Sequence, residues 1–392
     1  MTEAAAAADI AGLRVAIVNW RDPWHPEAGG AETFAWEMAQ GLLHRGARVT
    51  YLTARADGQV SGEQRDGVQI VRRGARFTVY PRVLAWLLRR RRRFDVVVDC
   101  QNGIPFFTPW VLPGRVPVFC VVHHVHDAQF GVHFSPVVAA AGRLLEGRIA
   151  RLAYRRHLTI AVSQSTARAL SERLGWTGPV RIIANGLGPD AFERPPAPAE
   201  PATLTWVGRI VAHKRAEQVL DVAGRLAPSG ATIDVIGHGP GEAELAAAVI
   251  GRGLAGTVRV RGYLPEEAKR AAVAASMLHL NTSMGEGWGL CVLEAAALGI
   301  PTVAYDVDGL RDAVRHGETG WLVRSGERIE DVTELALGEL ADPARRAQMA
   351  AACRSWAAQF SWDASAGQLA ELIAAAAGRA AGAGSLTVTR TG

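Results

Sequence analysis

Apolar runs of four to eight residues recur along the chain, and polar or glycine-containing segments separate them. The first run covers residues 13–19 (LRVAIVN), and the second covers residues 48–53 (RVTYLT). Between them, residues 31–44 (AETFAWEMAQGLLH) repeat their apolar positions at helical spacing. A strand, a helix and a strand at this pitch predict a right-handed parallel unit.

The same alternation continues through most of the sequence. Continuous apolar runs are typical of strands that are buried on both faces of a parallel sheet. We expect further strands at 94–100, 116–123, 158–163, 180–185, 204–207, 232–236, 258–261, 278–281 and 302–305. The chain is therefore predicted to be an α/β protein of two Rossmann-like, doubly wound halves that bind ligands at the carboxyl ends of their strands.

A proline-rich segment divides the two halves. Residues 194–202 (RPPAPAEPA) hold four prolines in nine positions, which is typical of a linker. We expect a first domain at 1–194, a linker at 195–202 and a second domain at 203–359. Residues 1–12 and 378–392 are expected to be disordered.

The composition fits a soluble globular protein, because 49% of the 392 residues are hydrophobic and 21% are charged. The net charge of +5 is too small and too scattered to indicate nucleic-acid binding. The four cysteines form no C-x-x-C pair, so neither a zinc site nor a disulfide framework is indicated. The sequence shows no apolar run of membrane-spanning length and no basic signal-peptide region, so we expect a cytoplasmic protein.

The most informative stretch is residues 285–301 (GEGWGLCVLEAAALGIP). Gly287 and Gly289 fall where a strand ends and a helix begins, and the free N–H groups of such a helix N-terminus suit a diphosphate. Glu294 is expected about two turns into this helix, where its carboxylate could accept hydrogen bonds from a ribose diol. The alternative is an amphipathic helix with a solvated glutamate.

Two cations follow the first strand of the second half. Arg209 comes directly after it in the stretch WVGRIVAHKR, and Lys214 comes five residues later. Positive charge there suits a leaving diphosphate, which gains negative charge as its bond to a sugar breaks. Only two of the 43 basic side chains are lysines, Lys214 and Lys269, and this favours a function for Lys214 over an ordinary loop cation.

Together these stretches resemble glycosyltransferase family 4, whose members are retaining, nucleotide-sugar-dependent enzymes with the GT-B fold. The resemblance covers about residues 13–373 and rests on short motifs in a fixed order. They are Gly29-Gly30-Ala31-Glu32, Asn185-Gly186 with Phe192, Val207-Gly208-Arg209 with Lys214, Gly237-His238-Gly239-Pro240, Arg261-Gly262-Tyr263-Leu264 and Glu286-x7-Glu294. In this family a C-terminal helix returns to the first domain, and residues 360–377 resemble that helix.

The resemblance implies a donor site that spreads over several loops. Arg209 and Lys214 would hold the donor diphosphate, and Glu294 would bind the ribose. Glu286 would contact the transferred sugar. The other donor-binding residues implied are Gly29, Gly30, Gly237, Tyr263, Gly287, Trp288, Gly289 and Leu290. Contacts with the base near Tyr263 would run through the backbone, so the choice of base is only weakly encoded.

Two positions depart from the family pattern. The family usually has glycine after the lysine, where this chain has Arg215. Trp288 replaces the commoner phenylalanine. Neither change touches a proposed charged contact, so we expect an effect on substrate shape.

A histidine cluster follows the run 116–122, and it comprises His123, His124 and His126 with Asp127 after them. In a strand, His124 and His126 would share a face, so a His-x-His metal site and a structural histidine are both open interpretations. The resemblance favours a third, in which His123 lies beside donor sugar and acceptor, and His126 and Asp127 are acceptor-side candidates. The implied catalytic set is His123, Arg209, Lys214 and Glu286.

Two further charged segments give weaker evidence of function than the motifs above. Asp306-Val307-Asp308 is a D-x-D sequence, but we interpret it as a turn and expect neither a metal nor a cofactor. The arginines from Arg89 to Arg93 follow an apolar stretch, and each is worth about 1 kcal/mol near anionic lipid. They indicate either a solvated helix end or a peripheral contact with the inner face of a membrane.

The sequence therefore predicts a retaining hexosyltransferase. It would move mannose or glucose from GDP or UDP to a hydroxyl of a saccharide, a lipid-linked or a small-molecule acceptor, and form an α-glycosidic bond. Closure about the linker would exclude water. The alternatives are a phosphorylase, which needs a pyridoxal-phosphate lysine, an epimerase, and a non-catalytic nucleotide-sugar-binding homologue.

Overall fold

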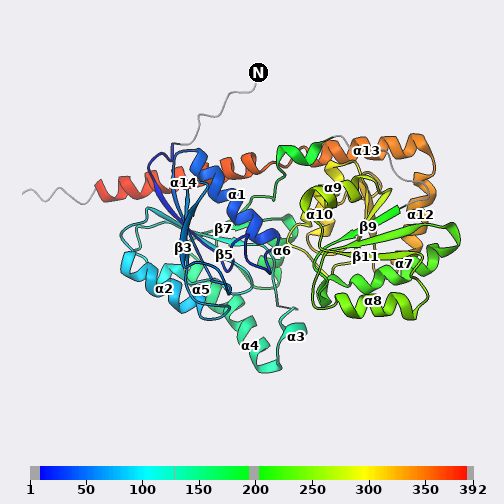
Figure 1. The fold of residues 1–392 in the computed structure, drawn as a ribbon. Coiled ribbons are helices and arrows are strands. Elements are labelled where there is room, and N and C mark those ends of the chain that lie inside the picture. The colour runs from blue at the N-terminus through cyan, green and yellow to red at the C-terminus, as the bar shows by residue number, and fades with distance from the viewer. Residues whose placement is uncertain (1–8, 128, 194–202, 386–392) are drawn as a thin grey trace, which may run out of the picture. The chain divides into compact units, whose positions relative to one another are not determined.

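The computed structural model describes residues 9–127, 129–193 and 203–385, which form two compact units (Figure 1). Unit 1 contains the chain up to Gly186 and again from Trp362, whereas unit 2 is the continuous stretch Leu187–Ser361. The units divide at Gly186 rather than at 194, because Leu187 forms a bridge with Ser361 and donates its N–H to the carbonyl of Phe360. The expected linker at 195–202 lies outside the described residues.

Unit 1 is built on an eight-stranded sheet with the order β3-β4-β2-β1-β5-β6-β7-β8. Neighbouring strands are parallel, except that β3 and β4 are antiparallel. The strands are β1 (Arg14–Val18), β2 (Arg48–Thr53), β3 (Gly62–Arg65), β4 (Val68–Arg72), β5 (Val96–Gln101), β6 (Val118–Val122), β7 (Leu158–Ala161) and β8 (Val180–Ile182). The helices are α1 (Gly30–His44), α2 (Val79–Arg90), α3 (Phe130–His133), α4 (Pro136–Leu144), α5 (Ala150–Tyr154), α6 (Gln164–Glu172) and α14 (Trp362–Ser385), with a π-helical turn at Leu145–Ile149.

Successive residues of these strands face opposite sides, so the sheet of unit 1 has a core on each face. On one face Val15 and Ile17 pack with α1 and α14, and on the other Ala16 and Val18 pack with α2, α5 and α6. Helix α14 lies against α1 (Figure 1), and a Cβ added at Gly41 would stand 2.2 Å from Cβ of Ala366. The C-terminal helix is therefore part of this core.

Two expectations about the chain ends are wrong. Residues 9–12 are ordered, because Ile10 is buried in the core and Gly12 donates its N–H to the carbonyl of Gly46. Helix α14 runs to Ser385 rather than to 377, and its alanine-rich composition favours the helix. Residues 1–8 and 386–392 lie outside the described residues.

Unit 2 is built on a six-stranded sheet with the order β11-β10-β9-β12-β13-β14, and all neighbouring strands are parallel. The strands are β9 (Thr203–Val207), β10 (Thr232–Ile236), β11 (Val258–Gly262), β12 (Leu278–Asn281), β13 (Thr302–Tyr305) and β14 (Gly320–Val323). The helices are α7 (Val219–Leu226), α8 (Glu242–Gly251), α9 (Glu266–Ala274), α10 (Leu290–Ala297), α11 (Leu310–Ala313), α12 (Ile329–Leu340) and α13 (Pro343–Ala357).

Helices cover both faces of the unit 2 sheet as well. Helices α7, α8 and α12 share one core with it, and α9 and α10 pack in another cluster (Figure 1). The prediction of two doubly wound α/β halves is confirmed.

Candidate active site

The loops after β9 and β12 bring two predicted site residues together in unit 2. Lys214 ends a short 3-10 helix, Ala212–Lys214, and its Nζ forms an ion pair with Oε1 of Glu286. Ser283 donates its hydroxyl to the same oxygen at 2.7 Å. Within the described part of the chain, the other carboxylate oxygen of Glu286 makes no hydrogen bond. It is therefore the atom that a ligand could reach.

Lys214 carries a positive charge at neutral pH. Burial, the largest single influence, would lower its pKa, but Glu286 and Cys291 together more than offset burial, so the pKa is raised. Arg209 opposes this effect with a charge of the same sign. Arg209 thus lies in the neighbourhood of Lys214.

Helix α10 begins later than the sequence suggests. Its N-cap is Gly289, whose φ of 88° lies in the left-handed region that favours glycine. The helix starts at Leu290, so Glu294 lies little more than one turn into it, and the expected two turns are wrong. Gly287 and Trp288 belong to the preceding loop.

Lys269 completes a second ion pair that sequence reasoning missed. It lies on α9, and its Nζ is 3.0 Å from Oε2 of Glu294 on α10. The two residues are 25 positions apart, so no local motif connects them. The rarity of lysine in the chain is the one signal that could have indicated a role for Lys269.

Four charged side chains lie around the first turn of α10. Burial raises the pKa of the Cys291 thiol to about 11, and Lys214, Glu286, Glu294 and Lys269 also act on it electrostatically. Charges that all influence one thiol lie in one neighbourhood. The structure therefore brings the two glutamates of the predicted motif together around the start of one helix.

The other predicted donor residues in unit 2 have local structural explanations. A Cβ at Gly237, where φ is 134°, would stand 1.9 Å from the carbonyl oxygen of Gly208, so these two loops pack backbone to backbone. Tyr263 is 70% exposed, with its ring 5.9 Å from that of His238. The buried ring of Trp288 packs edge-on against Phe360 at 5.0 Å.

The D-x-D sequence forms a loop that supports the Glu286 segment. Asp306 and Asp308 both pair with Arg311, at 2.9 and 3.5 Å, and Glu286 donates its N–H to the carbonyl of Asp308. A Cβ at Gly309 would stand 2.3 Å from the carbonyl oxygen of Glu286. Across the described ranges, no three His, Cys, Asp or Glu side chains cluster as a metal site requires.

In unit 1, His123 stands just beyond the carboxyl end of β6. Its side chain is buried, and its ring lies edge-on against Phe34 at 5.2 Å. Burial, with a smaller contribution from His126, lowers the pKa of His123 to about 3, so the ring is neutral at pH 7. Its Nε2 has no hydrogen-bond partner among the described residues.

The rest of the histidine cluster is held by neighbouring helices. Strand β6 ends at Val122, so the face-sharing argument for a strand does not apply, although the rings of His124 and His126 lie 5.3 Å apart. His126 donates its N–H to Oε1 of the buried Glu146 at 2.7 Å. Asp127 forms an ion pair with Arg173. Glu146 lies in the π-helical turn, and sequence reasoning missed it because no motif marks it.

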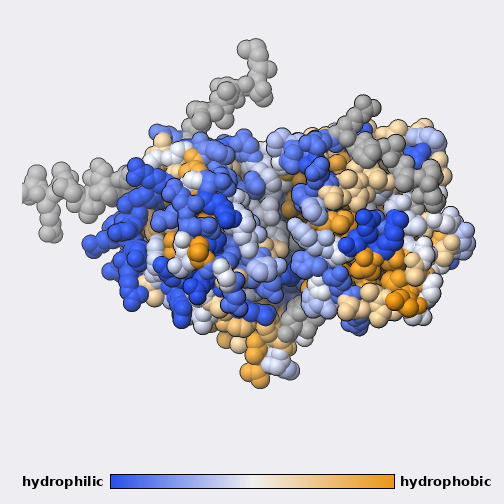
Figure 2. All heavy atoms as spheres, viewed as in Figure 1, coloured by the Kyte–Doolittle hydropathy of each residue, from blue (hydrophilic) through white to orange (hydrophobic). Residues whose placement is uncertain are grey.

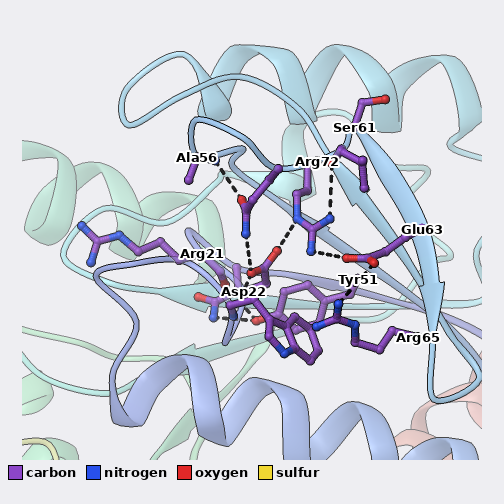
Figure 3. A network of polar contacts seen from close by, with 12 residues as sticks. Arg21, Asp22, Tyr51, Ala56, Ser61, Glu63, Arg65 and Arg72 are labelled. Atoms are coloured by element: carbon purple, nitrogen blue, oxygen red, sulfur yellow. Dashed lines mark hydrogen bonds and ion pairs between the residues drawn. The ribbon is translucent and has the colours of Figure 1, made fainter. Parts of the chain in front are cut away.

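The loop between β1 and α1 is fixed by a buried network (Figure 3). Arg72, at the end of β4, donates to Asp22, to Glu63 at 2.7 Å and to the carbonyl of Val60 at 3.2 Å. The side chains of Arg72 and Asp22 are 2% and 0% exposed. The network anchors one end of the loop that leads to the predicted glycines.

Gly29 and Gly30 form the start of α1. Gly29 is the N-cap with an extended backbone, and its N–H donates to Oε2 of Glu32 at 2.8 Å. This capping contact explains the Gly-x-x-Glu spacing without a ligand.

The predicted lipid-binding arginines lie at the end of α2. Arg90 packs over the ring of Trp86 at 4.4 Å, and Arg91, Arg92 and Arg93 follow the helix end and are exposed. Exposed apolar side chains lie on α2 itself, where Leu88 is 46% exposed, and on α4, where Val137 is 81% exposed. Figure 2 shows how hydrophilic and hydrophobic residues are distributed over one face of the molecule. None of the helices in the described ranges is both long and apolar enough to cross a membrane.

Comparison with known proteins identifies the family. A model described as Glycosyltransferase Family 4 matches residues 28–191, and one described as Glycosyl transferases group 1 matches residues 189–356. Together the two matches extend over most of the chain. The chain belongs to glycosyltransferase family 4.

Curated relatives of this glycosyltransferase differ in length. The D-inositol 3-phosphate glycosyltransferase of Rhodococcus erythropolis is 34% identical over 225 residues, which are 52% of this chain and 50% of the relative. The alpha-D-kanosaminyltransferase of Streptomyces kanamyceticus is 26% identical over 314 residues, which are 73% of this chain and 80% of the relative. The chain spans half or less of the length of several curated relatives that it matches.

Solved structures show that the glycosyltransferase has the GT-B fold. A sucrose-phosphate synthase from Thermosynechococcus elongatus is similar with a TM-score of 0.78 at 20% identity, over 92% of this chain and 98% of the other. Anabaena HepE, solved with UDP-glucose, is similar with a TM-score of 0.71 at 19% identity, over 93% and 100%. At these identities the likeness shows the fold alone.

The departure at Arg215 has a structural reason. Its φ of 49° is left-handed, which explains why the family favours glycine at this position. The Arg215 guanidinium donates to the carbonyls of Thr282 at 2.9 Å and Ser283 at 3.3 Å, and it packs over the ring of Tyr305. These contacts connect the loop that carries Lys214 to the end of β12.

Proposed function

We propose that this glycosyltransferase transfers a hexose, glucose or mannose, from a UDP or GDP donor to a hydroxyl group with retention of the α configuration. The observation that carries the proposal is the group of four charged side chains at the start of α10, two cations and two carboxylates. A nucleotide-sugar donor combines the chemical groups that such a set recognises, an anionic diphosphate and polar sugar hydroxyls.

The cations would stabilise the leaving group. As the bond between sugar and diphosphate breaks, negative charge grows on the diphosphate, and Lys214 and Arg209 would neutralise it. The N-terminus of α10 adds a positive dipole end and free N–H groups. The remaining oxygen of Glu286 would accept a hydrogen bond from the transferred sugar, and Glu294 would bind the ribose.

His123 is the proposed catalytic residue of unit 1. Because its ring is neutral at pH 7 and Nε2 is unpartnered among the described residues, Nε2 is available for a hydroxyl of the acceptor or of the sugar. The acceptor hydroxyl would attack from the face that the diphosphate leaves. The name of one relative, D-inositol 3-phosphate glycosyltransferase, supports a small polyol phosphate as acceptor, and a saccharide or lipid-linked acceptor stays a prediction.

The two lysines weigh against the phosphorylase alternative. A pyridoxal-phosphate Schiff base needs an amine that can lose its proton, whereas Lys214 and Lys269 are both paired with glutamates that raise their pKa. We propose that neither a metal nor a cofactor is required, because Arg209 and Lys214 supply the positive charge. The cytoplasmic location and a peripheral membrane contact through Arg89 to Arg93 stay predictions.

The first test is nucleotide binding by the purified chain. UDP, GDP, ADP, UDP-glucose and GDP-mannose are added in a thermal-shift assay, where a ligand at 100 times its Kd adds about 2.7 kcal/mol to stability. We expect a clear shift with one nucleotide family, its loss in Lys214→Met, and its retention in Arg252→Met. Arg252 is a matched control because it pairs with Asp221 at the surface of unit 2.

If none of these compounds raises the melting temperature of the chain, the result would contradict the proposal. If a donor is found, NMR of the product measures the anomeric configuration. An inverted product would contradict the retaining mechanism, and sugar release or epimerisation without transfer to any acceptor would favour another enzyme class.

A further inference from the structure

Both lysines of the chain face the glutamates of the Glu286-x7-Glu294 motif. Lys214 pairs with Glu286, and Lys269 pairs with Glu294. The other 41 of the 43 basic side chains are arginines. Lys269 has no part in the donor contacts proposed above, so its pairing calls for a separate explanation.

We propose that Lys269 is a positioning residue of the donor site, which holds Glu294 by one carboxylate oxygen and leaves the other oxygen for the ribose of a nucleoside diphosphate. The inference rests on the proposed function, because it assumes that Glu294 binds ribose. It adds a residue from α9 to a site otherwise built from the loops around α10.

Lys269 contacts only one of the two carboxylate oxygens of Glu294. The Lys269 ammonium contacts Oε2 of Glu294, and within the described residues Oε1 makes no hydrogen bond. The two side chains are 18% and 30% exposed, so water screens their attraction less than at the open surface. The second partner of Lys269 is Glu266 at 2.9 Å, which is 65% exposed and therefore a weaker contact.

The charge of Lys269 also keeps Glu294 in the form that ribose needs. Burial raises the pKa of Glu294, Lys269 counteracts this, and Glu266 adds to the rise. Without Lys269, the remaining influences all favour the protonated carboxyl. An ionised carboxylate accepts hydrogen bonds from both hydroxyls of a diol, whereas a protonated one is a poorer acceptor.

The choice of lysine over arginine follows from the same geometry. An ammonium group is a compact point charge, whereas a guanidinium binds a carboxylate through two parallel hydrogen bonds to both oxygens. An arginine at position 269 would therefore compete with the ribose for Oε1 of Glu294. This accounts for a lysine here in a chain that uses arginine almost everywhere else.

The test compares ribonucleotides with their deoxy counterparts. Calorimetry measures the Kd of the full chain for UDP, GDP and ADP and for the 2′-deoxy form of each. A hydrogen bond to a charged group is expected to give the wild type about a tenfold preference for the ribonucleotide that it binds. In Lys269→Met, ribonucleotide binding should weaken by about the same factor and deoxynucleotide binding should not, so the preference disappears.

Two further variants separate positioning from charge alone. Lys269→Arg keeps the charge and should still lose most of the preference, whereas Glu266→Gln, the matched control, should stay within about twofold of the wild type. Thermal unfolding without nucleotide checks that each variant is folded. If Lys269→Met does not fold, Lys269→Gln is used in its place.

The outcomes distinguish this inference from the proposed function. Equal weakening of ribo- and deoxynucleotide binding, an unchanged preference in Lys269→Met, or wild-type behaviour of Lys269→Arg would each overturn the role of Lys269. A wild type that binds no nucleotide would contradict the proposed function and the inference together. A wild type that binds nucleotides without a preference would contradict the ribose role of Glu294.

Discussion

The ion pair between Arg72 and Asp22 is expected to be the most sensitive polar contact of unit 1. Both side chains are almost fully buried, and Asp22 also accepts hydrogen bonds from the N–H of Trp24 at 3.0 Å and from Gln59 at 3.2 Å. Replacing Arg72 with methionine leaves the Asp22 carboxylate buried without its cation. Removal of one partner of a buried pair costs about 3–5 kcal/mol of unfolding free energy.

The chain offers a matched control with the same residue types. Arg14 and Asp95 form a two-pronged pair at 2.7 and 3.0 Å, but their side chains are 47% and 32% exposed. Arg14→Met is therefore expected to cost about 0–1 kcal/mol. The double change Arg72→Met with Asp22→Asn removes the orphaned charge and keeps an acceptor for Trp24, so it should recover at least about 1 kcal/mol of the loss.

Urea unfolding followed by tryptophan fluorescence measures these differences, and thermal unfolding provides a second reading. In a unit of this size, 1 kcal/mol corresponds to about 2–4 °C in Tm. The nucleotide binding proposed for unit 2 serves as the check that the rest of the molecule is intact. If Arg72→Met falls within about 1 kcal/mol of Arg14→Met, or if the double change is no better than the single one, burial of the pair does not determine its contribution.

Four further predictions concern the site. Lys214→Met should abolish sugar transfer with unchanged circular dichroism, and near-normal turnover would remove Lys214 from the mechanism. A chelator should leave transfer unchanged, and a loss that a divalent ion restores would revive a metal role. The buried, neutral His123 has a pKa of about 3, below the ordinary 6.5, so the stability that it contributes is present above pH 6.5 and lost as the pH falls. Between pH 7 and 5 this loss is about 2 kcal/mol, and His123→Gln should show a correspondingly shallower pH dependence in urea unfolding. Arg215→Ala should be about 1 kcal/mol less stable than Arg215→Gly in the same assay, because both lose the guanidinium contacts and only alanine keeps the left-handed strain; equal stabilities would show that the backbone there is relaxed.

Strands buried on both faces were the most predictable part of the fold. Residues 48–53, 232–236, 278–281 and 302–305 were expected as strands, and the structure has β2, β10, β12 and β13 with these bounds. Strands β3, β4 and β14 were not expected. The edge strand β3 (GEQR) is entirely polar or glycine and carries no apolar run. Helix starts were less predictable, since the loop before α10 depends on a left-handed glycine.

The candidate site was predictable only where short motifs carry it. The pairing of Lys214 with Glu286 joins two recognised motifs, so the sequence indicated both partners although 72 residues separate them. Lys269 and Glu146 were given no role, because each contacts a residue on another segment of the chain that no spacing rule reveals. The chemistry of a side chain can be read from its type, but its partner depends on how the helices pack.

The return of α14 to unit 1 affects the order in which the protein can fold during translation. Ala366, Leu369, Ala370 and Ile373 are part of the core that covers α1. This core therefore stays incomplete until all of Leu187–Ser361 has left the ribosome, which takes roughly 10–35 s at ordinary elongation rates.

During that time the part of α1 that packs against α14 has no partner, while the uninterrupted chain of unit 2 can already form its own sheet. We therefore expect the nascent N-terminal segment to expose apolar surface that favours aggregation until α14 is made. A fragment that ends before α14 should be recovered as aggregate.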